Sequence, residues 1–426
     1  MAVAPWLSHT RKLVQQQDGL RLADTLILDP TSHNFTTLQQ QLRQDPAARS
    51  LSSSTRSALP DNRPLADFLA NFLTYVRDCP PPHAGDVASL DKAYTLLEDC
   101  FKTADRLFAI GETGWFVPTL RRLTRRLVDV ALAVGRASGD PKLTRAGEAA
   151  RMLGRPMGIA ASDRTSDSPC KRDALFFLAN STFRVYFALS NLRLCDTVLN
   201  NTNNSSAVLE AYPRADQAAF LYYRGRIALY QRRLPQARND LRRAFALSHA
   251  AAWKQGRLIL IYLIAASLPL GFFPSPALLQ HFSLDAPYSS LLPALKKGNF
   301  TAVLAALDAH QAWHRRCGNY LLLREKLETV CWRNLARQTL YITTNGAPLP
   351  PTGPPTLSLP LLLATARVAF PAGATLDIDD VEAMCAALVE QGYIKAYILH
   401  AKRLLVLQKG PLCGFPPLAS VNTVPG

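Results

Sequence analysis

Apolar residues at helical spacing, repeated along most of the chain, are the feature that most limits its fold. From Pro64 onward they recur three and four positions apart in long segments, and short turn-like breaks separate these segments. Helices are therefore predicted at residues 65–77, 87–110, 115–137 and 143–153. Residues 154–169 are predicted to form a loop that closes this first set of helices.

The clearest repeating unit covers residues 214–249, where two amphipathic helices follow one another. Pro213 introduces the first helix, and the inward positions of the pair carry mostly small and apolar residues with tetratricopeptide-repeat (TPR) spacing. One such helix pair cannot bury its own apolar face, so neighbouring helices must stack on it. These neighbours are expected at residues 172–199, 253–267 and 300–342. The repeat spacing is carried by Leu221, Gly225, Ala228, Ala237, Leu241 and Ala244.

The C-terminal part has a different order of elements. A Pro-rich stretch at residues 345–360 is predicted to break the helical array, and a helix is predicted at 357–369. Asp379 and Asp380 then supply a cap and first-turn charge to a second helix, which Gly392 ends. Two β-prone runs, 393–398 and 404–409, flank a polar turn and predict a hairpin. Helix, helix and hairpin in this order indicate a winged helix.

The predicted fold class is therefore mainly α, a right-handed superhelix of TPR-like helical repeats followed by a C-terminal winged helix. Four parts are expected along the chain. Residues 1–62 form a partly flexible N-terminal segment, in which residues 49–60 have the composition of a solvated linker. Residues 63–169 form N-terminal helical repeats, 170–344 the TPR-like helical part, and 345–426 the winged helix with a C-terminal tail.

The charge balance indicates a polyanionic partner. Lys and Arg number 48 against 32 Asp and Glu, which gives a formal net charge of +16 and would attract nucleic acid or acidic proteins. The eight cysteines have no metal-ligand spacing and are interpreted as reduced core thiols. The N-terminus lacks an apolar signal-peptide core, and the most apolar run, 258–273, is shorter than the roughly 20 residues that cross a bilayer. An intracellular chain without a membrane segment is expected.

The densest basic cluster lies within the TPR-like part. Between residues 213 and 260 there are ten Arg or Lys residues and two acidic ones. Like charges such as Arg238 and Arg242, four positions apart on one helix, repel by roughly 0.2–0.5 kcal/mol. A groove for an acidic peptide or for phosphates is predicted, and an exposed solubilising face is the alternative. The predicted acidic-partner groove comprises Arg224, Arg232, Arg233, Arg238, Arg242, Arg243, Lys254 and Arg257.

A second basic set is expected on the wing of the winged helix, where four basic residues occur and residues 393–410 contain no acid. In a winged helix such side chains can contact a phosphate backbone, whereas the acidic helix before the hairpin is a poor reader of bases. The same module can instead be a surface for pairing with another subunit. The predicted nucleic-acid-binding residues are Lys395, Lys402, Arg403 and Lys409 on the wing, together with Arg315 and Arg316, for which a partly neutralised face is the alternative.

No catalytic signature is found in the sequence. The chain lacks a phosphate-binding loop, a dinucleotide-binding glycine pattern and a nucleophile elbow. His310 and His314 have the spacing of two zinc ligands on a helix, but the glutamate of the metalloprotease motif is missing and no third ligand is evident. No catalytic residue, metal or cofactor is therefore predicted, and an interaction protein is favoured over an enzyme.

Several strings between residues 172 and 421 resemble the PCI proteins of the family that includes the PCI subunit of the second transcription-export complex and the signalosome subunit-twelve-like proteins. The resemblance covers more than half of the chain. The strings consist mostly of core and turn residues, so they identify the fold better than the complex. They are AFLYYRG at 219–225, RLILIYL at 257–263, RCGNYLLLREKL at 316–327, RNL at 333–335 and DIDDVEAMCAALVEQGYIKAY at 377–397, with GWFVP at 114–118 further upstream.

The resemblance implies a non-catalytic PCI scaffold in the nucleus, with the cytoplasm as a second location. Its partners would be a larger PCI-like protein bound through the winged helix, a small acidic intrinsically disordered subunit, and RNA or double-stranded DNA. Such a hetero-oligomer would act in transcription elongation, mRNA processing or mRNA export. The alternative is a signalosome-like or proteasome-lid-like interaction subunit that does not bind nucleic acid.

Overall fold

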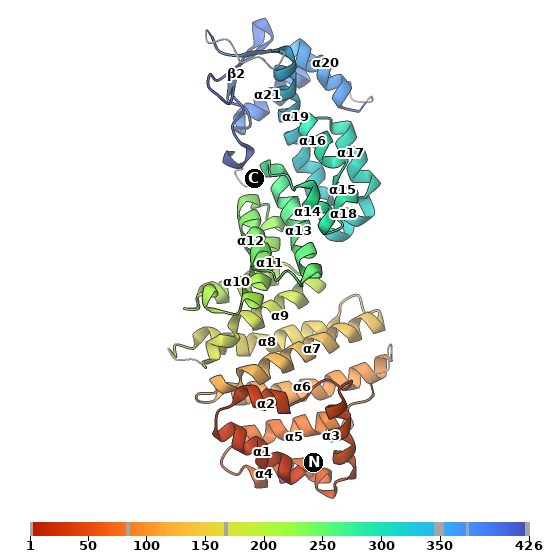
Figure 1. Ribbon diagram of the computed structural model, residues 1–426, viewed down its shortest axis with the longest axis vertical. Coiled ribbons are helices and arrows are strands. Elements are labelled where there is room, and N and C mark those ends of the chain that lie inside the picture. The colour runs from red at the N-terminus through yellow and green to blue at the C-terminus, as the bar shows by residue number, and fades with distance from the viewer. Residues whose placement is uncertain (1–2, 82–85, 166–168, 345–352, 372–374, 422–426) are drawn as a thin grey trace. The chain divides into compact units, whose positions relative to one another are not determined.

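The computed structural model describes residues 3–81, 86–165, 169–344, 353–371 and 375–421, and most of this range is helical (Figure 1). The chain divides into two compact units, Met1–Tyr223 and Arg224–Gly426. Helix α11, Arg214–Tyr230, contains the boundary between them. The helical content confirms the mainly α fold class, whereas the division into four parts stays a prediction.

Unit 1 is built from helices that pack each on the next, as the successive layers α5 to α8 show in Figure 1. Asn62 caps α5 by accepting a hydrogen bond from the Leu65 backbone N–H, and Phe72 and Phe101 lie in the core. The helices predicted between residues 65 and 153 are confirmed. The α-helices of unit 1 are α1 Val3–Gln15, α2 Gly19–Thr25, α3 His33–Gln44, α4 Leu51–Ala58, α5 Arg63–Asp78, α6 Val87–Ala109, α7 Val117–Ser138, α8 Thr144–Ser162, α9 Leu175–Ala188 and α10 Arg193–Asn203.

Two segments that the sequence predicted as irregular are helical in unit 1. The linker predicted at residues 49–60 was wrong, because α4 forms there and packs on α5 with Leu51 and Thr55 buried. The Thr55 hydroxyl donates a hydrogen bond to the Leu51 carbonyl, so this polar side chain can be buried within the helix. The polar composition of the segment therefore did not indicate a helix with a buried side. The loop predicted from residue 154 begins later, because α8 runs through Pro156 to Ser162 while Pro156 and Met157 pack into the core. Residues 166–168 of that loop lie outside the described residues.

Unit 2 begins within α11 and continues through a series of shorter helices. The predicted helix pair is present, and a Cβ atom on Gly225 would lie 2.7 Å from Leu241 Cγ, so the small residue permits the close approach of α11 and α12. The predicted helical stretch 300–342 is divided at His310 and Gly318 into three helices. The α-helices after α11 are α12 Leu234–Leu247, α13 Trp253–Ser267, α14 Pro276–His281, α15 Asp285–Tyr288, α16 Leu291–Lys297, α17 Phe300–Ala309, α18 Gln311–Cys317 and α19 Tyr320–Thr343.

The end of unit 2 is the predicted winged helix. Strand β1 (Thr356–Ser358) precedes α20 (Leu359–Ala369) and α21 (Ile378–Glu390), and β2 (Ala396–Leu399) and β3 (Leu404–Leu407) form the wing. The sheet is antiparallel in the order β1-β3-β2, and Leu405 is the register partner of both Leu357 and Ile398. Asp377, rather than Asp379, caps α21 in a capping box with Asp380. Residues 345–352 of the predicted Pro-rich break lie outside the described residues.

The cysteines and the most apolar run of the chain are mostly buried in the helical core. None of the eight cysteines, all of which lie in the described ranges, forms a disulfide. Six are buried, while Cys317 and Cys413 are half-buried, so the interpretation as core thiols is confirmed for six of them. The apolar run 258–273 forms most of α13 and the 3-10 turn Leu268–Leu270. Within the described part of the chain, none of the helices combines the length and the apolar character that a bilayer crossing requires.

Candidate basic surfaces of the second unit

The four wing residues surround the hairpin formed by β2 and β3. Lys395 lies directly before β2, Lys402 and Arg403 form the turn, and Lys409 follows β3. Arg403 adopts a left-handed backbone conformation with φ of 52°, and its carbonyl accepts a hydrogen bond from the Leu359 N–H. All four side chains are exposed, and none forms an ion pair with another described residue. The wing therefore presents four positive charges that the protein itself does not neutralise.

Helix α21 contributes carboxylates next to this wing, but several are already engaged. Asp377 and Asp380 bind each other's backbone N–H groups in the capping box. Glu382 lies 2.8 Å from His400 Nδ1 in the hairpin turn, so this carboxylate holds the turn against α21. The Glu382 carboxylate thus reaches the hairpin turn through His400, and it forms no ion pair with the four wing residues in the described structure.

Two members of the predicted acidic-partner groove form ion pairs within unit 2. Arg224 binds Asp240 through two hydrogen bonds of 2.8 and 2.7 Å, and Asp240 is only 2% exposed. Arg232 lies 2.5 Å from Glu325, which connects the end of the α11–α12 turn to α19. Carboxylates therefore balance these two arginines in the folded chain.

Two other members of this set contact α14 and the loop before it. Arg257 donates from Nε to the Phe282 carbonyl at 2.9 Å and so binds the C-terminal end of α14. The Arg238 guanidinium lies 3.4 Å from the Phe272 ring centroid, and burial, with help from the nearby charge of Arg242, lowers its pKa. Both arginines have structural contacts in addition to their charge.

The remaining members are more accessible. Arg233 is exposed and hydrogen-bonds to Gln231, Arg243 is half-buried, and Arg242 and Lys254 are exposed without an ion pair inside the described part of unit 2. Arg233, Arg242 and Lys254 therefore carry the exposed charge of the predicted groove that no ion pair in the described structure balances. Sequence reasoning did not distinguish these side chains from the paired ones, because the partners lie on other helices.

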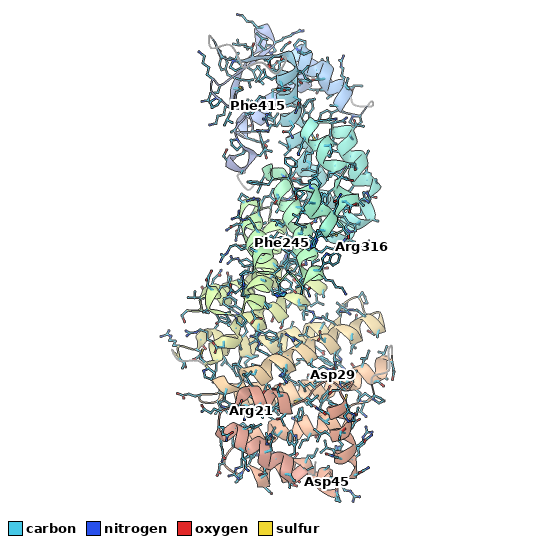
Figure 2. The ribbon with its side chains drawn as sticks, in the orientation of Figure 1. Arg21, Asp29, Asp45, Phe245, Arg316 and Phe415 are labelled. Atoms are coloured by element: carbon cyan, nitrogen blue, oxygen red, sulfur yellow. The ribbon has the colours of Figure 1, made fainter. Side chains whose placement is uncertain are left out.

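Arg315 and Arg316 lie on the exposed surface of α18, and Arg316 is labelled in Figure 2. Arg315 is positioned over the Tyr320 ring, 5.5 Å from its centroid. Burial raises the pKa of the Cys317 thiol, and the nearby positive charges of Arg316, Arg257 and Arg226 oppose that rise. Arg316 of the predicted nucleic-acid set and Arg257 of the predicted groove set therefore both act on the Cys317 thiol.

His310 and His314, which have zinc-ligand spacing but were not predicted to bind a metal, do not both lie within one helix. His310 is the residue between α17 and α18, whereas the His314 ring is fully buried beside Tyr288 and Trp313. Burial lowers the pKa of His314 to about 4, and neither of its ring nitrogens has a hydrogen-bond partner. Among the described residues no group of three or more potential metal ligands occurs. His314 is therefore part of the core of unit 2.

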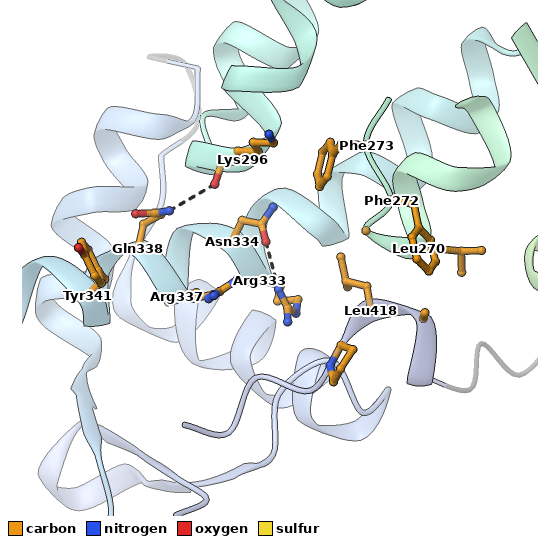
Figure 3. Close-up of a pocket in the computed structure, with 13 residues that line it drawn as sticks. Leu270, Phe272, Phe273, Lys296, Arg333, Asn334, Arg337, Gln338, Tyr341 and Leu418 are labelled. Atoms are coloured by element: carbon orange, nitrogen blue, oxygen red, sulfur yellow. Dashed lines mark hydrogen bonds between the residues drawn. The ribbon is translucent and has the colours of Figure 1, made fainter. Parts of the chain in front are cut away.

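A third basic surface, which the sequence did not predict, is a hollow of about 590 Å³ beside α19 (Figure 3). Arg333, Arg337 and Lys296 contribute to its lining, and Arg333 is only 4% exposed. Arg333 Nη2 donates to the Pro416 carbonyl at 2.7 Å, which fixes the C-terminal segment against α19. Burial, together with the neighbouring charge of Arg337, lowers the pKa of Arg333 to about 10. The residues that line the hollow come from distant parts of the chain, so their spacing in the sequence could not predict this surface.

Helical repeats that end in a winged helix define the PCI class of fold, and comparison with known proteins agrees with this class. No protein-family model matches the chain. A PCI domain-containing protein of Schizosaccharomyces pombe is 30% identical over 100% of this chain and 97% of its own length. PCI domain-containing protein 2 of Xenopus laevis is 31% identical over 73% of this chain and 75% of its own length. Enhanced ethylene response protein 5 of Arabidopsis thaliana is 29% identical over 56% of each chain.

The chain therefore belongs to the PCI domain-containing protein family. Its relatives indicate a scaffold-type subunit of a multiprotein complex, and proteins of this family are generally non-catalytic and form hetero-oligomers. The family resemblance predicted from the sequence strings is confirmed at this level. The export-complex and signalosome-like subfamilies remain hypotheses.

Proposed function

We propose that this chain is a nuclear scaffold subunit that links transcription to mRNA processing and export. In this proposal the winged helix pairs with a larger PCI-like protein, and a small acidic subunit binds the helical part of unit 2. The wing then contributes to a surface for RNA or double-stranded DNA with little sequence preference. Family membership supports the scaffold role, and the charges of the wing support the binding of nucleic acid.

The observation that carries the nucleic-acid part is the set of unneutralised cations at the hairpin. Lys395, Lys402, Arg403 and Lys409 are exposed and form no ion pair with a described residue. Cations that contact phosphates release condensed counterions, so each contact gives affinity that falls as salt rises. By contrast, Arg224 and Arg232 already have carboxylate partners and would release fewer counterions.

The test replaces the four wing residues with glutamate in the full-length chain. Affinity for RNA and for double-stranded DNA is measured by fluorescence anisotropy, with the partner subunits present. We expect weaker binding to all sequences, because the contacts are to phosphates and not to bases. A control variant reverses four exposed cations of unit 1 that have the same total charge, namely Lys12, Arg136, Lys142 and Arg193.

The comparison of the two variants decides the proposal. If the wing variant binds as the unchanged chain does, or if the control variant weakens binding equally, the wing is not a specific contact surface. Circular dichroism of both variants shows whether the helical fold is retained, so that a loss of binding is not a loss of folding.

The acidic-subunit part of the proposal depends on the accessible members of the groove. Arg242 and Lys254 are exposed and without ion pairs in the described structure, so they are available to carboxylates of a partner. Arg242→Glu combined with Lys254→Glu should release an acidic subunit that copurifies with the unchanged chain. Retention of that subunit at equal stoichiometry would contradict this placement.

A second candidate function is a protein-interaction subunit that does not bind nucleic acid. Exposed apolar side chains on the winged helix favour it, because such side chains are common at protein interfaces. Val368 on α20 is 82% exposed, and Tyr397 and Leu399 lie on the exposed side of the edge strand β2. The anisotropy measurement, made at low salt, separates the two functions, because this candidate predicts no binding of RNA or DNA.

A further inference from the structure

The hollow beside α19 concentrates positive charge that no carboxylate offsets. Lys296 at the end of α16 and Arg333 and Arg337 on α19 all line it, and no acidic side chain lines it among the described residues (Figure 3). A neighbouring hollow of about 570 Å³ shares Arg333, Arg337, Tyr341 and Pro417 with the first, and its described lining likewise contains no acid. The two hollows therefore share a basic wall on α19.

Arg333 is the unusual member, because its guanidinium is buried without a counterion. Its Nη2 and Nη1 atoms donate to the Pro416 carbonyl and to Asn334 Oδ1, both neutral acceptors, and its Nε has no partner. Removal of a guanidinium from water is unfavourable unless a negative charge compensates it. Arg337, one helical turn further along α19, is exposed and has no ion pair within the described structure, so it adds repulsion. An anion bound beside this pair would compensate the buried charge of Arg333 and would reduce its repulsion with Arg337.

The walls of the hollow favour a ligand that is partly apolar. Leu270, Phe273 and Leu418 lie on the side of the hollow away from Arg337 in Figure 3, and Tyr341, which is 62% exposed, lies at the other end. Lys296 lies over the Phe273 ring, 4.9 Å from its centroid, so the charged and aromatic surfaces are contiguous. A volume of about 590 Å³ is in the range of small-molecule sites and accommodates a ligand with a ring and an anionic group.

We propose that this hollow binds a small organic phosphate, with its phosphoryl group on Arg337, Lys296 and the rim of Arg333 and its apolar part against Phe273 and Leu418. A phosphoryl group carries about −1.5 to −2 charge at pH 7 and three acceptor oxygens. Three cations in the lining of one hollow match that charge better than they match a single carboxylate. None of the four wing residues lines this hollow, and the proposal goes beyond the proposed function, on which it does not depend.

Phenyl phosphate is the probe, because it combines one ring with one phosphoryl group. Its binding to the full-length chain is measured by isothermal titration calorimetry at constant ionic strength, beside phenol and benzoate. We expect phenyl phosphate to bind and phenol to bind at least about tenfold more weakly. Equal binding of phenol would overturn the anion site, and equal binding of benzoate would overturn the assignment to phosphate.

The variants place the site in the hollow. Arg337→Gln combined with Lys296→Gln should weaken phenyl phosphate binding at least about tenfold. Lys297→Gln is the matched control, because Lys297 is the next residue of α16 and is exposed but does not line the hollow. Arg333 is retained, since its bond to Pro416 holds the C-terminal segment. Equal affinities in the double variant and the control would overturn the proposal.

A competition experiment separates a small-molecule site from a contact with nucleic acid. Single-stranded RNA is added to the complex with phenyl phosphate at constant ionic strength. No displacement is expected, because the wing and the hollow involve different residues. Displacement of phenyl phosphate that is lost in the Arg337 and Lys296 double variant would place an RNA phosphate in the hollow and would overturn the small-molecule assignment.

Discussion

Acidification should destabilise unit 2 through one buried histidine. The His314 ring is 0% exposed, lies beside Tyr288 and Trp313, and has no hydrogen-bond partner on either nitrogen. Burial lowers its pKa from 6.5 to about 4, and His310 contributes to the shift. The folded chain therefore keeps this ring neutral at a pH where the unfolded chain already binds a proton.

The size of the effect follows from the two pKa values. The contribution of the neutral His314 to the free energy of unfolding is complete above pH 6.5. It falls as the pH decreases toward 4, because only the unfolded state gains the proton in that interval. One pKa unit corresponds to about 1.4 kcal/mol, so the full loss is about 3 kcal/mol. Between pH 7 and pH 5 the expected loss is about 2 kcal/mol. The remainder is lost at lower pH, where many carboxylates also titrate.

Urea unfolding at pH 7 and pH 5 measures this loss, with circular dichroism as the signal. His314→Leu removes the titrating group and places an apolar side chain of similar size at the buried site. The variant should lose about 2 kcal/mol less stability than the unchanged chain between the two pH values. His249→Asn is the control, because His249 is exposed and its replacement should leave the pH dependence intact. An equal pH dependence in His314→Leu and the unchanged chain would refute the reasoning.

Three further predictions concern the packing of unit 2, each measured as the free energy of urea unfolding. Gly298→Ala should cost about 2–4 kcal/mol, because φ is +73° and the new Cβ would lie 2.7 Å from Leu335 Cα; an unchanged value contradicts this. Gly225→Leu should cost at least about 2 kcal/mol by separating α11 from α12, and a loss below about 1 kcal/mol contradicts this. Asp240→Asn should cost roughly 2 kcal/mol by removing the counterion of Arg224, and Arg224→Met with Asp240→Leu should recover most of it.

Local spacing explains which parts of the fold could be predicted from the sequence. The four helices of residues 65–153 and the α12 helix have apolar residues at regular helical intervals, so their inner faces are evident without knowledge of their neighbours. Strand β1 could not be predicted in this way. It has three residues, and its pairing partner β3 lies far along the chain.

The candidate sites likewise differ in whether their residues are close in the sequence or meet only in the folded chain. The wing was predicted because Lys395, Lys402, Arg403 and Lys409 belong to one short hairpin whose residues are close in sequence. The pairing of Arg232 with Glu325 was not predictable, since the two residues meet only after α19 packs near the α11–α12 turn. The hollow around Arg333 requires α16, α19 and the C-terminal segment together. Composition located the excess charge, and only the tertiary structure separates neutralised charge from accessible charge.

The salt dependence of RNA affinity tests the proposed function most directly. The affinity of the full-length chain with its partner subunits is measured over a series of salt concentrations, and the slope of log K against log salt is compared with that of the wing variant. Four phosphate contacts on single-stranded RNA correspond to a slope that is less steep by about 3 in the variant. We predict this reduction. The same slope in both proteins, or no RNA binding at low salt, would contradict a nucleic-acid-binding wing.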